Sequence, residues 1–260
     1  MLDIKKLYKS RLVQAAIIAL LVSAIIDPVT KGQTFRQWGN PFMWWMFMNR
    51  GIGGTIFHRL FWILPVLLTG AVFVDERNTT ICGVLLTRQR RGRYFLSKTL
   101  AAFTVSFFST LAIFLLNLGL VYRVCPTNME ISDFLIPKEG SLAAGLYARS
   151  PFLMAVCYNL MAAFAMALLT VLYQQVHMIL RLKNKYVALL VPVMLMYVLN
   201  YIVDICGMWQ YSITILLQPV AASAMTIILD SKSYILVFGT LILADIVLFF
   251  IAEGRNRDIL

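Results

Sequence analysis

The chain alternates long apolar runs with shorter polar segments. Six runs are predicted to cross a membrane as helices, because a helix of about 20 apolar residues spans the hydrocarbon core of a bilayer. Prolines modify two of them: Pro28 is expected to end or bend the first helix, and Pro65 is expected to kink the second. The predicted spans are residues 13–26, 55–74, 99–122, 151–180, 186–205 and 234–252.

The residues before the first span alternate between apolar and basic side chains. A helix over residues 1–12 would place an apolar face toward lipid and lysines on the opposite face. The apolar positions are Leu2, Ile4, Leu7 and Tyr8, and the basic positions are Lys5, Lys6 and Lys9. We therefore predict an amphipathic helix that lies in the inner membrane interface.

The segments on the outer side are aromatic or interrupted by polar residues. An interfacial segment is expected over residues 30–54, because Trp38, Phe42, Trp44, Trp45 and Phe47 favour the headgroup level. A loop is expected over residues 123–150. In residues 206–233, the apolar run 213–229 is broken by Gln218 and Pro219. A span there would make seven spans and place the C-terminus outside. We prefer two short helices that re-enter the outer leaflet, because the run is broken and only residues 230–233 separate it from the next apolar run.

Composition and charge support a membrane protein. Hydrophobic residues make up 60% of the chain and charged residues 13%, with a mean hydropathy of +0.80, whereas soluble domains carry about 25% charged residues. We predict one all-α membrane domain over residues 1–260. The net charge is +11, and six spans place most of the 23 Lys and Arg residues inside. Both termini are then cytoplasmic, and the basic charge needs no nucleic-acid partner.

The sequence lacks the common motifs of catalysis. It contains no G-x-x-x-x-G-K-[ST] phosphate loop, no H-E-x-x-H and no G-x-S-x-G. We therefore expect no enzymatic activity, metal or cofactor in this chain. The four cysteines lack metal-ligand spacing, and Cys125 and Cys206 are both expected on the outer side. A disulfide between these two and a pair of free thiols remain alternatives.

The basic segment, residues 75–98, joins the second and third predicted spans. An acidic residue ends the second span, a glycine and an apolar stretch follow, then a run of arginines, and Lys98 opens the third span. Such a segment can form a short helix that seats apolar residues in a partner's groove, while arginines pair with carboxylates or lipid phosphates. The alternative is a loop whose charges only set the topology. The predicted binding residues are Glu76, Gly83, Val84, Leu85, Leu86, Arg88, Arg90 and Arg91.

This order of residues resembles the cytoplasmic loop of type-2 ATP-binding-cassette (ABC) exporter permeases. The resemblance implies that residues 75–98 contain a coupling helix that docks on a separate ATP-binding subunit, which holds ATP and Mg. It also implies a second permease copy or paralogue, contacts with membrane lipids, and export of an amphipathic substrate across a bacterial plasma membrane. The alternatives are a membrane sensory or anchoring subunit without transport, and an ion-coupled secondary transporter.

Several polar residues fall inside the predicted spans. Asp245 lies in the last span, and a carboxyl group there is a candidate for the transport pathway or for structural pairing. The asparagines Asn117, Asn159 and Asn200 are expected either to line the pathway or to tie helices together. Gln174, Gln175 and His177 are predicted to form a solvated helix end at the inner surface, and the alternative is a cytoplasmic extension that contacts the ATP-binding subunit.

Overall fold

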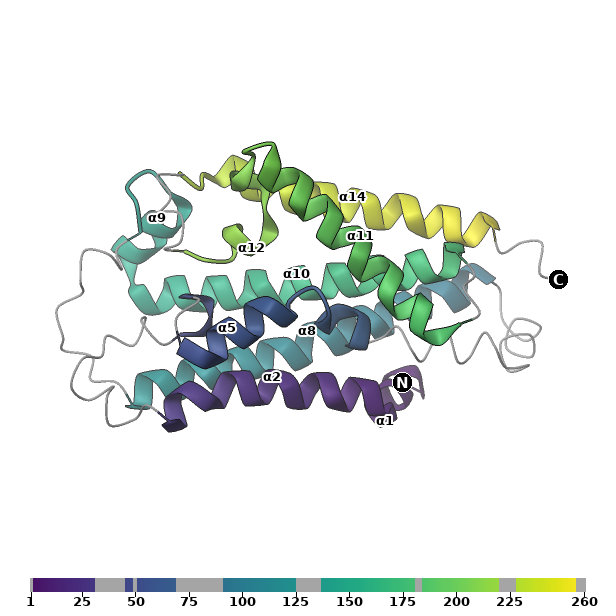
Figure 1. The fold of residues 1–260 in the computed structure, drawn as a ribbon, viewed down its shortest axis with the longest axis horizontal. Coiled ribbons are helices and arrows are strands. Elements are labelled where there is room, and N and C mark those ends of the chain that lie inside the picture. Colours follow the sequence, from purple (N-terminus) through teal and green to yellow (C-terminus); the bar gives the residue numbers. More distant parts are fainter. Residues whose placement is uncertain are drawn as a thin grey trace.

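The computed structural model describes residues 2–30, 45–48, 51–68, 91–124, 137–180, 184–219 and 228–255, and every regular element in these ranges is helical (Figure 1). Five helices are long and apolar enough to cross a membrane. They are α2 (Arg11–Thr30), α8 (Arg91–Val124), α10 (Pro151–Leu180), α11 (Lys185–Ile205) and α14 (Ser231–Arg255). The prediction of an all-α, multi-pass membrane protein is therefore confirmed.

Helix α10 is the centre of the bundle. In its most apolar stretch 61% of the residues are buried, against 22% in α11 and in α14. It packs along α8 and α14, and α2 packs on the far side of α8 (Figure 1). Alanines at 162, 163 and 165 are fully buried, and such small side chains let neighbouring helices approach closely. The predicted span 151–180 coincides with this helix.

Helix α2 continues through Pro28 to Thr30, so of the two predicted effects of Pro28, ending the first span is wrong, and bending it stays a prediction. Proline has no N–H, so the carbonyl group of Ala24, four residues earlier, loses its helical partner. The side-chain amide of Asn117 on α8 donates to this carbonyl at 2.7 Å. Because the open backbone group is satisfied from the neighbouring helix, α2 can remain helical within the apolar bundle.

The second predicted span is interrupted within its described part. Helix α5 (Gly51–Leu60) is followed by a turn over residues 61–63, and residues 64–68 are helical again. Pro65 lies in the first turn of this second helical piece, where a backbone N–H would have no partner within the helix, so the missing N–H of proline costs no hydrogen bond. The Trp62 carbonyl within the turn accepts a hydrogen bond from the Tyr173 hydroxyl at 3.1 Å. Residues 69–74 of the predicted span lie outside the described residues.

An aromatic cluster occupies the half of the core that is predicted to face the outer side. Trp45 and Phe47, beside and within the short helix η1 (Met46–Met48), are fully buried. The Phe47 ring packs edge-to-face against Phe57 of α5 and Phe114 of α8, with centroids 5.4 and 5.0 Å away. Trp45 and Phe47 therefore face the protein interior, and their predicted position at the headgroup level stays a prediction. Their rings have aromatic partners inside the protein, and the Trp45 indole has an acceptor there.

Short helices cover the end of the bundle that is predicted to face the outer side. Helix α9 (Leu142–Arg149) lies within the region predicted as a loop, and Ser141 caps it by accepting from the Ala144 N–H at 3.1 Å. Between α11 and α14 the described chain forms only η3 (Trp209–Tyr211) and α12 (Ile213–Leu216). Within the described part of the apolar run 213–229, helix α12 ends at Leu216, before Gln218; residues 220–227 lie outside the described residues, and the predicted re-entry stays a prediction.

The bond from Asn117 to Ala24 predicts a specific rescue. Asn117→Leu should destabilise the protein by about 1–3 kcal/mol, because it strands the Ala24 carbonyl. In the Asn117→Leu background, Pro28→Ala should recover part of this loss, since residue 28 regains an N–H for that carbonyl. Thermal unfolding of the four proteins of this double-mutant cycle in detergent measures the coupling. Strictly additive changes in stability would contradict this explanation of Asn117.

Candidate functional site

The predicted coupling residues fall almost entirely outside the described residues. Glu76, Gly83, Val84, Leu85, Leu86, Arg88 and Arg90 lie in the range 69–90, which the structure does not describe. Arg91 is the first residue of α8. The helix therefore begins eight residues before the predicted start of the third span at residue 99. The last part of the basic segment, residues 91–98, is continuous with a membrane-crossing helix.

The end of the basic segment is attached to the N-terminal helix α1 (Leu2–Lys9). Lys98 is 3% exposed, and its ammonium group forms a hydrogen-bonded ion pair with the Asp3 carboxylate. The Ser97 hydroxyl donates to the same carboxylate at 3.0 Å. Burial alone would raise the pKa of Asp3, but the hydrogen bond and charge of Lys98 outweigh it and lower that pKa below the ordinary value. We call Asp3, Ser97 and Lys98 the anchor.

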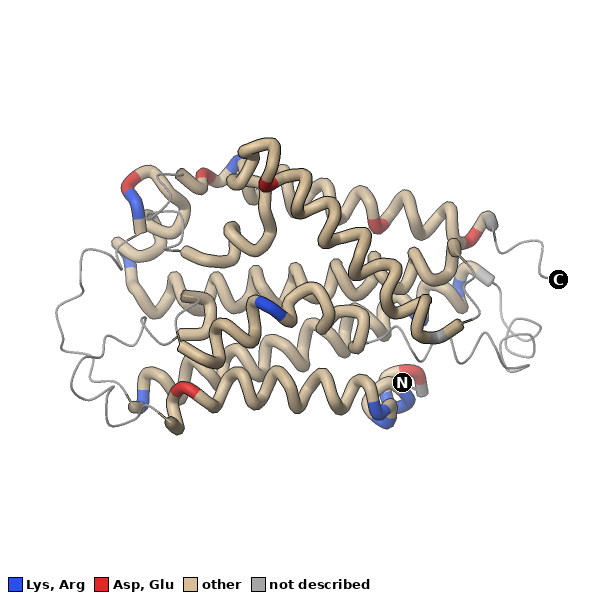
Figure 2. Tube along the Cα trace, in the orientation of Figure 1, with Lys and Arg blue, Asp and Glu red and all other residues tan. Residues whose placement is uncertain are grey.

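Helix α1 is amphipathic, as predicted. Leu7 is 1% exposed and belongs to the core, while Lys5, Lys6 and Lys9 are on the exposed side. The Tyr8 and Ser109 hydroxyl groups are 2.9 Å apart, so α1 also contacts α8 eleven residues beyond Lys98. The basic residues of α1 lie at the same end of the bundle as the end of α14 (Figure 2). This is the end predicted to face the cytoplasm.

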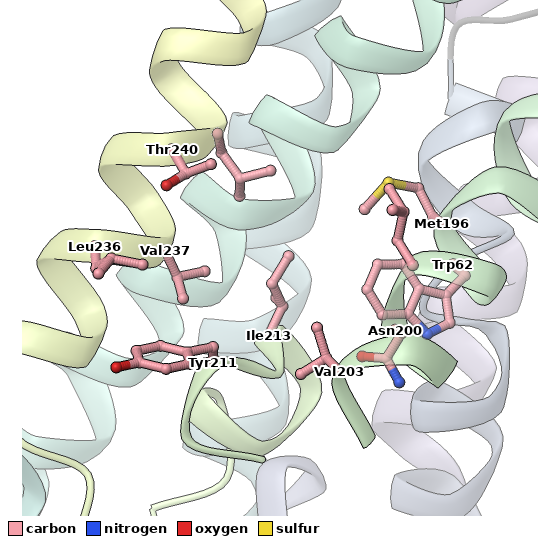
Figure 3. Close-up of a pocket in the computed structure, with 11 residues that line it drawn as sticks. Trp62, Met196, Asn200, Val203, Tyr211, Ile213, Leu236, Val237 and Thr240 are labelled. Carbon is pink, nitrogen blue, oxygen red and sulfur yellow. The ribbon is translucent and has the colours of Figure 1, made fainter. Parts of the chain in front are cut away.

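An apolar groove of about 210 Å³ lies between α11 and α14. In Figure 3, Leu236, Val237 and Thr240 of α14 form one wall, Met196 and Trp62 stand on the opposite side, and Ile213 of α12 lies between them. Trp62 belongs to the turn at residues 61–63, which interrupts the second predicted span, and its side chain lines this groove. The remaining lining residues are Leu199, Asn200, Val203, Tyr211 and Leu241. The groove can hold an apolar chain.

The three asparagines act as ties between elements. Asn159 accepts from the Trp45 indole N–H at 3.1 Å, and Asn117 accepts from the Met46 N–H at 3.3 Å, so both hold the segment around η1. Asn200 lies apart from them, at the groove. Its amide donates to Asp204 at 3.0 Å, and its carbonyl oxygen accepts from the Ser212 hydroxyl at 2.9 Å. All three therefore have partners that account for their position.

Asp245 differs from the asparagines. It is 7% exposed, and neither carboxylate oxygen has a hydrogen-bond partner among the described residues. Gln174 is fully buried, and neither its amide nitrogen nor its amide oxygen has a hydrogen-bond partner among the described residues. Gln175 is 1% exposed, and its side-chain carbonyl oxygen also lacks such a partner. The prediction of a solvated helix end at Gln174, Gln175 and His177 is therefore wrong, because all three side chains are buried.

Asp27 has a structural role that was not predicted from the sequence. This residue of α2 is 2% exposed, and its two oxygens accept from the N–H groups of Ile52 and Gly53 at 2.9 and 2.8 Å. It thereby caps α5 from a different helix. A Cβ atom at Gly53 would lie 2.1 Å from the Ser23 carbonyl oxygen, so this close approach requires glycine. The signal in the sequence was a carboxylate in an apolar run, the same signal that singled out Asp245.

Among the cysteines of the described residues, Cys157 and Cys206 are free thiols. Cys125, the residue considered as a partner for Cys206, lies outside the described residues. The proposed alternative of free thiols therefore holds for Cys206.

Comparisons of the chain with protein-family models, with curated proteins and with solved structures find no match.

The anchor predicts a local effect of Asp3→Asn. Removing the charge should weaken the hydrogen bond from buried Lys98, a loss of about 1.5–3 kcal/mol for a bond between charged groups. The amides of α1 should then exchange with solvent deuterium about tenfold faster or more, as measured by mass spectrometry at neutral pH, while those of α10 are unchanged. Lys5→Gln, on the exposed face of α1, is the matched control. Unchanged protection of α1 in Asp3→Asn would show that the anchor does not hold the helix.

The two buried carboxylates predict opposite outcomes for the same substitution. Asp27→Asn should lower the unfolding free energy by about 1–3 kcal/mol, because the NH2 group that replaces one carboxylate oxygen cannot accept the hydrogen bond that this oxygen received from α5. Asp245→Asn should leave stability equal or higher, since no bond to a described residue is lost and an ionisable group is removed from a buried position. Thermal unfolding of both variants in detergent measures the difference. An equal loss in Asp245→Asn would show that this carboxylate is structurally paired.

Proposed function

We propose that this chain is the membrane-spanning permease subunit of a type-2 ABC transporter. It exports an amphipathic substrate, such as a peptide, a lipid-like molecule or a drug. The basic segment, residues 75–98, docks on a separate ATP-binding subunit, which supplies ATP and Mg. A second permease, identical or related, completes the transport pathway.

The observation that carries the proposal is the anchor. The last residue of the basic segment, Lys98, is buried in the bundle and bound to Asp3 of α1. Residues 91–98 are helical and continue directly into the membrane-crossing part of α8. A partner that moves the basic segment would therefore move α8 and α1 as well. A loop that only set the topology would need no such attachment.

The arrangement of the helices supports six crossings. Helix α5 begins beside the outer end of α2, where Asp27 caps it, and Trp62 contacts Tyr173 in the inner half of α10. The described part of the second predicted span thus runs from the outer end of the bundle toward the inner end. With the five long helices, this brings the start of α1 and the end of α14 to the same end (Figure 1).

Co-purification tests the proposal directly. An ATP-binding subunit encoded beside this gene should copurify with the chain in mild detergent, and its ATPase activity should rise in the complex. Recovery of the chain without any ATP-binding protein, and the absence of such a gene nearby, would remove the support for this function.

Two substitutions in the basic segment predict uncoupling. Gly83→Trp should block close approach of the segment to its partner, and Glu76→Lys should reverse a charge at its start. Both variants should insert normally into the membrane, yet lose ATPase docking or separate ATP hydrolysis from transport. Transport and copurification are measured for both, with Lys5→Gln as a charge-altering control outside the segment. Wild-type transport by both variants would contradict the role of residues 75–98 in coupling.

A further inference from the structure

Two hollows of different character meet at the outer ends of α11 and α14. The first is the apolar groove described above. The second is a polar pocket of about 210 Å³ next to the start of α14. Tyr211 and Leu236 line both hollows, and in Figure 3 the Tyr211 ring lies beneath Leu236 with its hydroxyl group directed out of the groove. The polar pocket is also lined by Gln210, Ile228, Asp230, Lys232 and Ser233.

We propose that the groove and the polar pocket together bind one phosphatidylethanolamine molecule. One acyl chain lies in the groove between α11 and α14, and the zwitterionic headgroup lies in the polar pocket. Tyr211 and Leu236 stand where the chain joins the headgroup.

The dimensions and lining of the groove fit an acyl chain. Its volume of about 210 Å³ is below the roughly 300–1,000 Å³ of pockets that enclose drug-sized ligands. Only Asn200, Tyr211 and Thr240 among its lining residues carry polar side chains, apart from the indole of Trp62. The Asn200 amide is already bonded to Asp204 and Ser212. A narrow apolar chain therefore suits the groove better than a compact polar molecule.

The polar pocket carries one charge of each sign. Asp230 caps α14, because its Oδ1 accepts from the Ser233 N–H at 2.9 Å and from the Ser233 hydroxyl at 2.8 Å. Lys232 is exposed and has no hydrogen-bond or ion-pair partner among the described residues. Lys232 can therefore pair with a phosphate, and the remaining carboxylate oxygen of Asp230 can accept from a primary ammonium. An ethanolamine headgroup supplies both charges on one ligand, whereas a fatty acid supplies only the negative one.

The headgroup has to provide the preference for a phospholipid over an uncharged lipid with the same acyl chains. Lipid tails in the bilayer are as apolar as leucine side chains, so a chain that enters the groove gains packing but little hydrophobic free energy. A basic side chain near the membrane surface contributes about 1 kcal/mol toward an anionic lipid group. Binding that depended on the groove alone would therefore not distinguish a phospholipid from an uncharged lipid with the same chains.

Photo-crosslinking of the full chain in lipid nanodiscs tests the proposal. Two probes carry the same diazirine-labelled acyl chains, one being phosphatidylethanolamine and the other diacylglycerol. Phosphatidylethanolamine should label groove residues such as Met196 and Leu241 in preference to the exposed residues Ile246 and Phe250 of α14, and more strongly than diacylglycerol does. Equal labelling by the two probes, or labelling spread evenly over the exposed face, would mean annular lipid only and would overturn the proposal.

Matched variants separate the two parts of the site. Leu236→Trp should block the groove and abolish labelling there, whereas Ile235→Trp, the adjacent and 72% exposed residue outside both hollows, should not. Lys232→Gln should remove the preference for phosphatidylethanolamine over diacylglycerol. Retained groove labelling in Leu236→Trp, or a preference that survives Lys232→Gln, would contradict the assignment. The labelling requires no ATP-binding partner, so its outcome is independent of the proposed transport function.

Discussion

Backbone groups that a helix leaves open inside a membrane have to find partners within the protein, and the α2–α5 half of the bundle is built around this constraint. Pro28 removes a bond from α2, α5 begins inside the core, and the chain turns at Trp62. A side chain from another helix compensates at each point. Asn117 donates to the Ala24 carbonyl, the Asp27 carboxylate caps α5, and the Tyr173 hydroxyl donates to the Trp62 carbonyl. These polar residues are therefore the means by which an interrupted chain remains in an apolar environment.

The half of the bundle that is predicted to face the cytoplasm differs, because it contains buried polar groups without hydrogen-bond partners among the described residues. Thr170 and Ser106 are bonded at 3.0 Å, and one helical turn further inward on α10 the polar atoms of Gln174 have no partner among the described residues. Asp245, on the facing helix α14, is in the same condition. Each unsatisfied buried group costs about 1–3 kcal/mol, so such groups persist where a water, a ligand or another segment can pair with them. Gln174 and Asp245 therefore mark a part of the bundle where new bonds can form.

The sequence was sufficient to predict the bounds of a helix where a single run of residues determines that helix. The spans 151–180 and 186–205 were predicted to within a residue, because Asn184 caps α11 and polar residues separate the two runs. It was insufficient where a distant residue decides the outcome. Nothing near Pro28 indicates that Asn117 will take over its missing bond, and nothing near Trp45 indicates that Asn159 will draw it into the core. The turn at residues 61–63 depends in the same way on Tyr173 of α10. The described part of the candidate coupling site, residues 91–98, was expected at a membrane surface, but its attachment to Asp3 required the tertiary structure.

The packing determines what a force on the basic segment could change. Lys98 belongs to α8, and α8 packs extensively on α10, so these two helices respond as one unit together with α1. Helix α11 is only 22% buried in its apolar stretch, and it contacts α10 and η3 more than it contacts α14. A displacement of the α1–α8–α10 unit would therefore leave α11 the element most able to tilt, since the fewest packing interactions oppose it. The groove between α11 and α14 is the space whose width such a tilt alters. Under the proposed function, the anchor at the inner end and the groove at the outer end are thus the two ends of one mechanical connection, with α10 as its rigid centre.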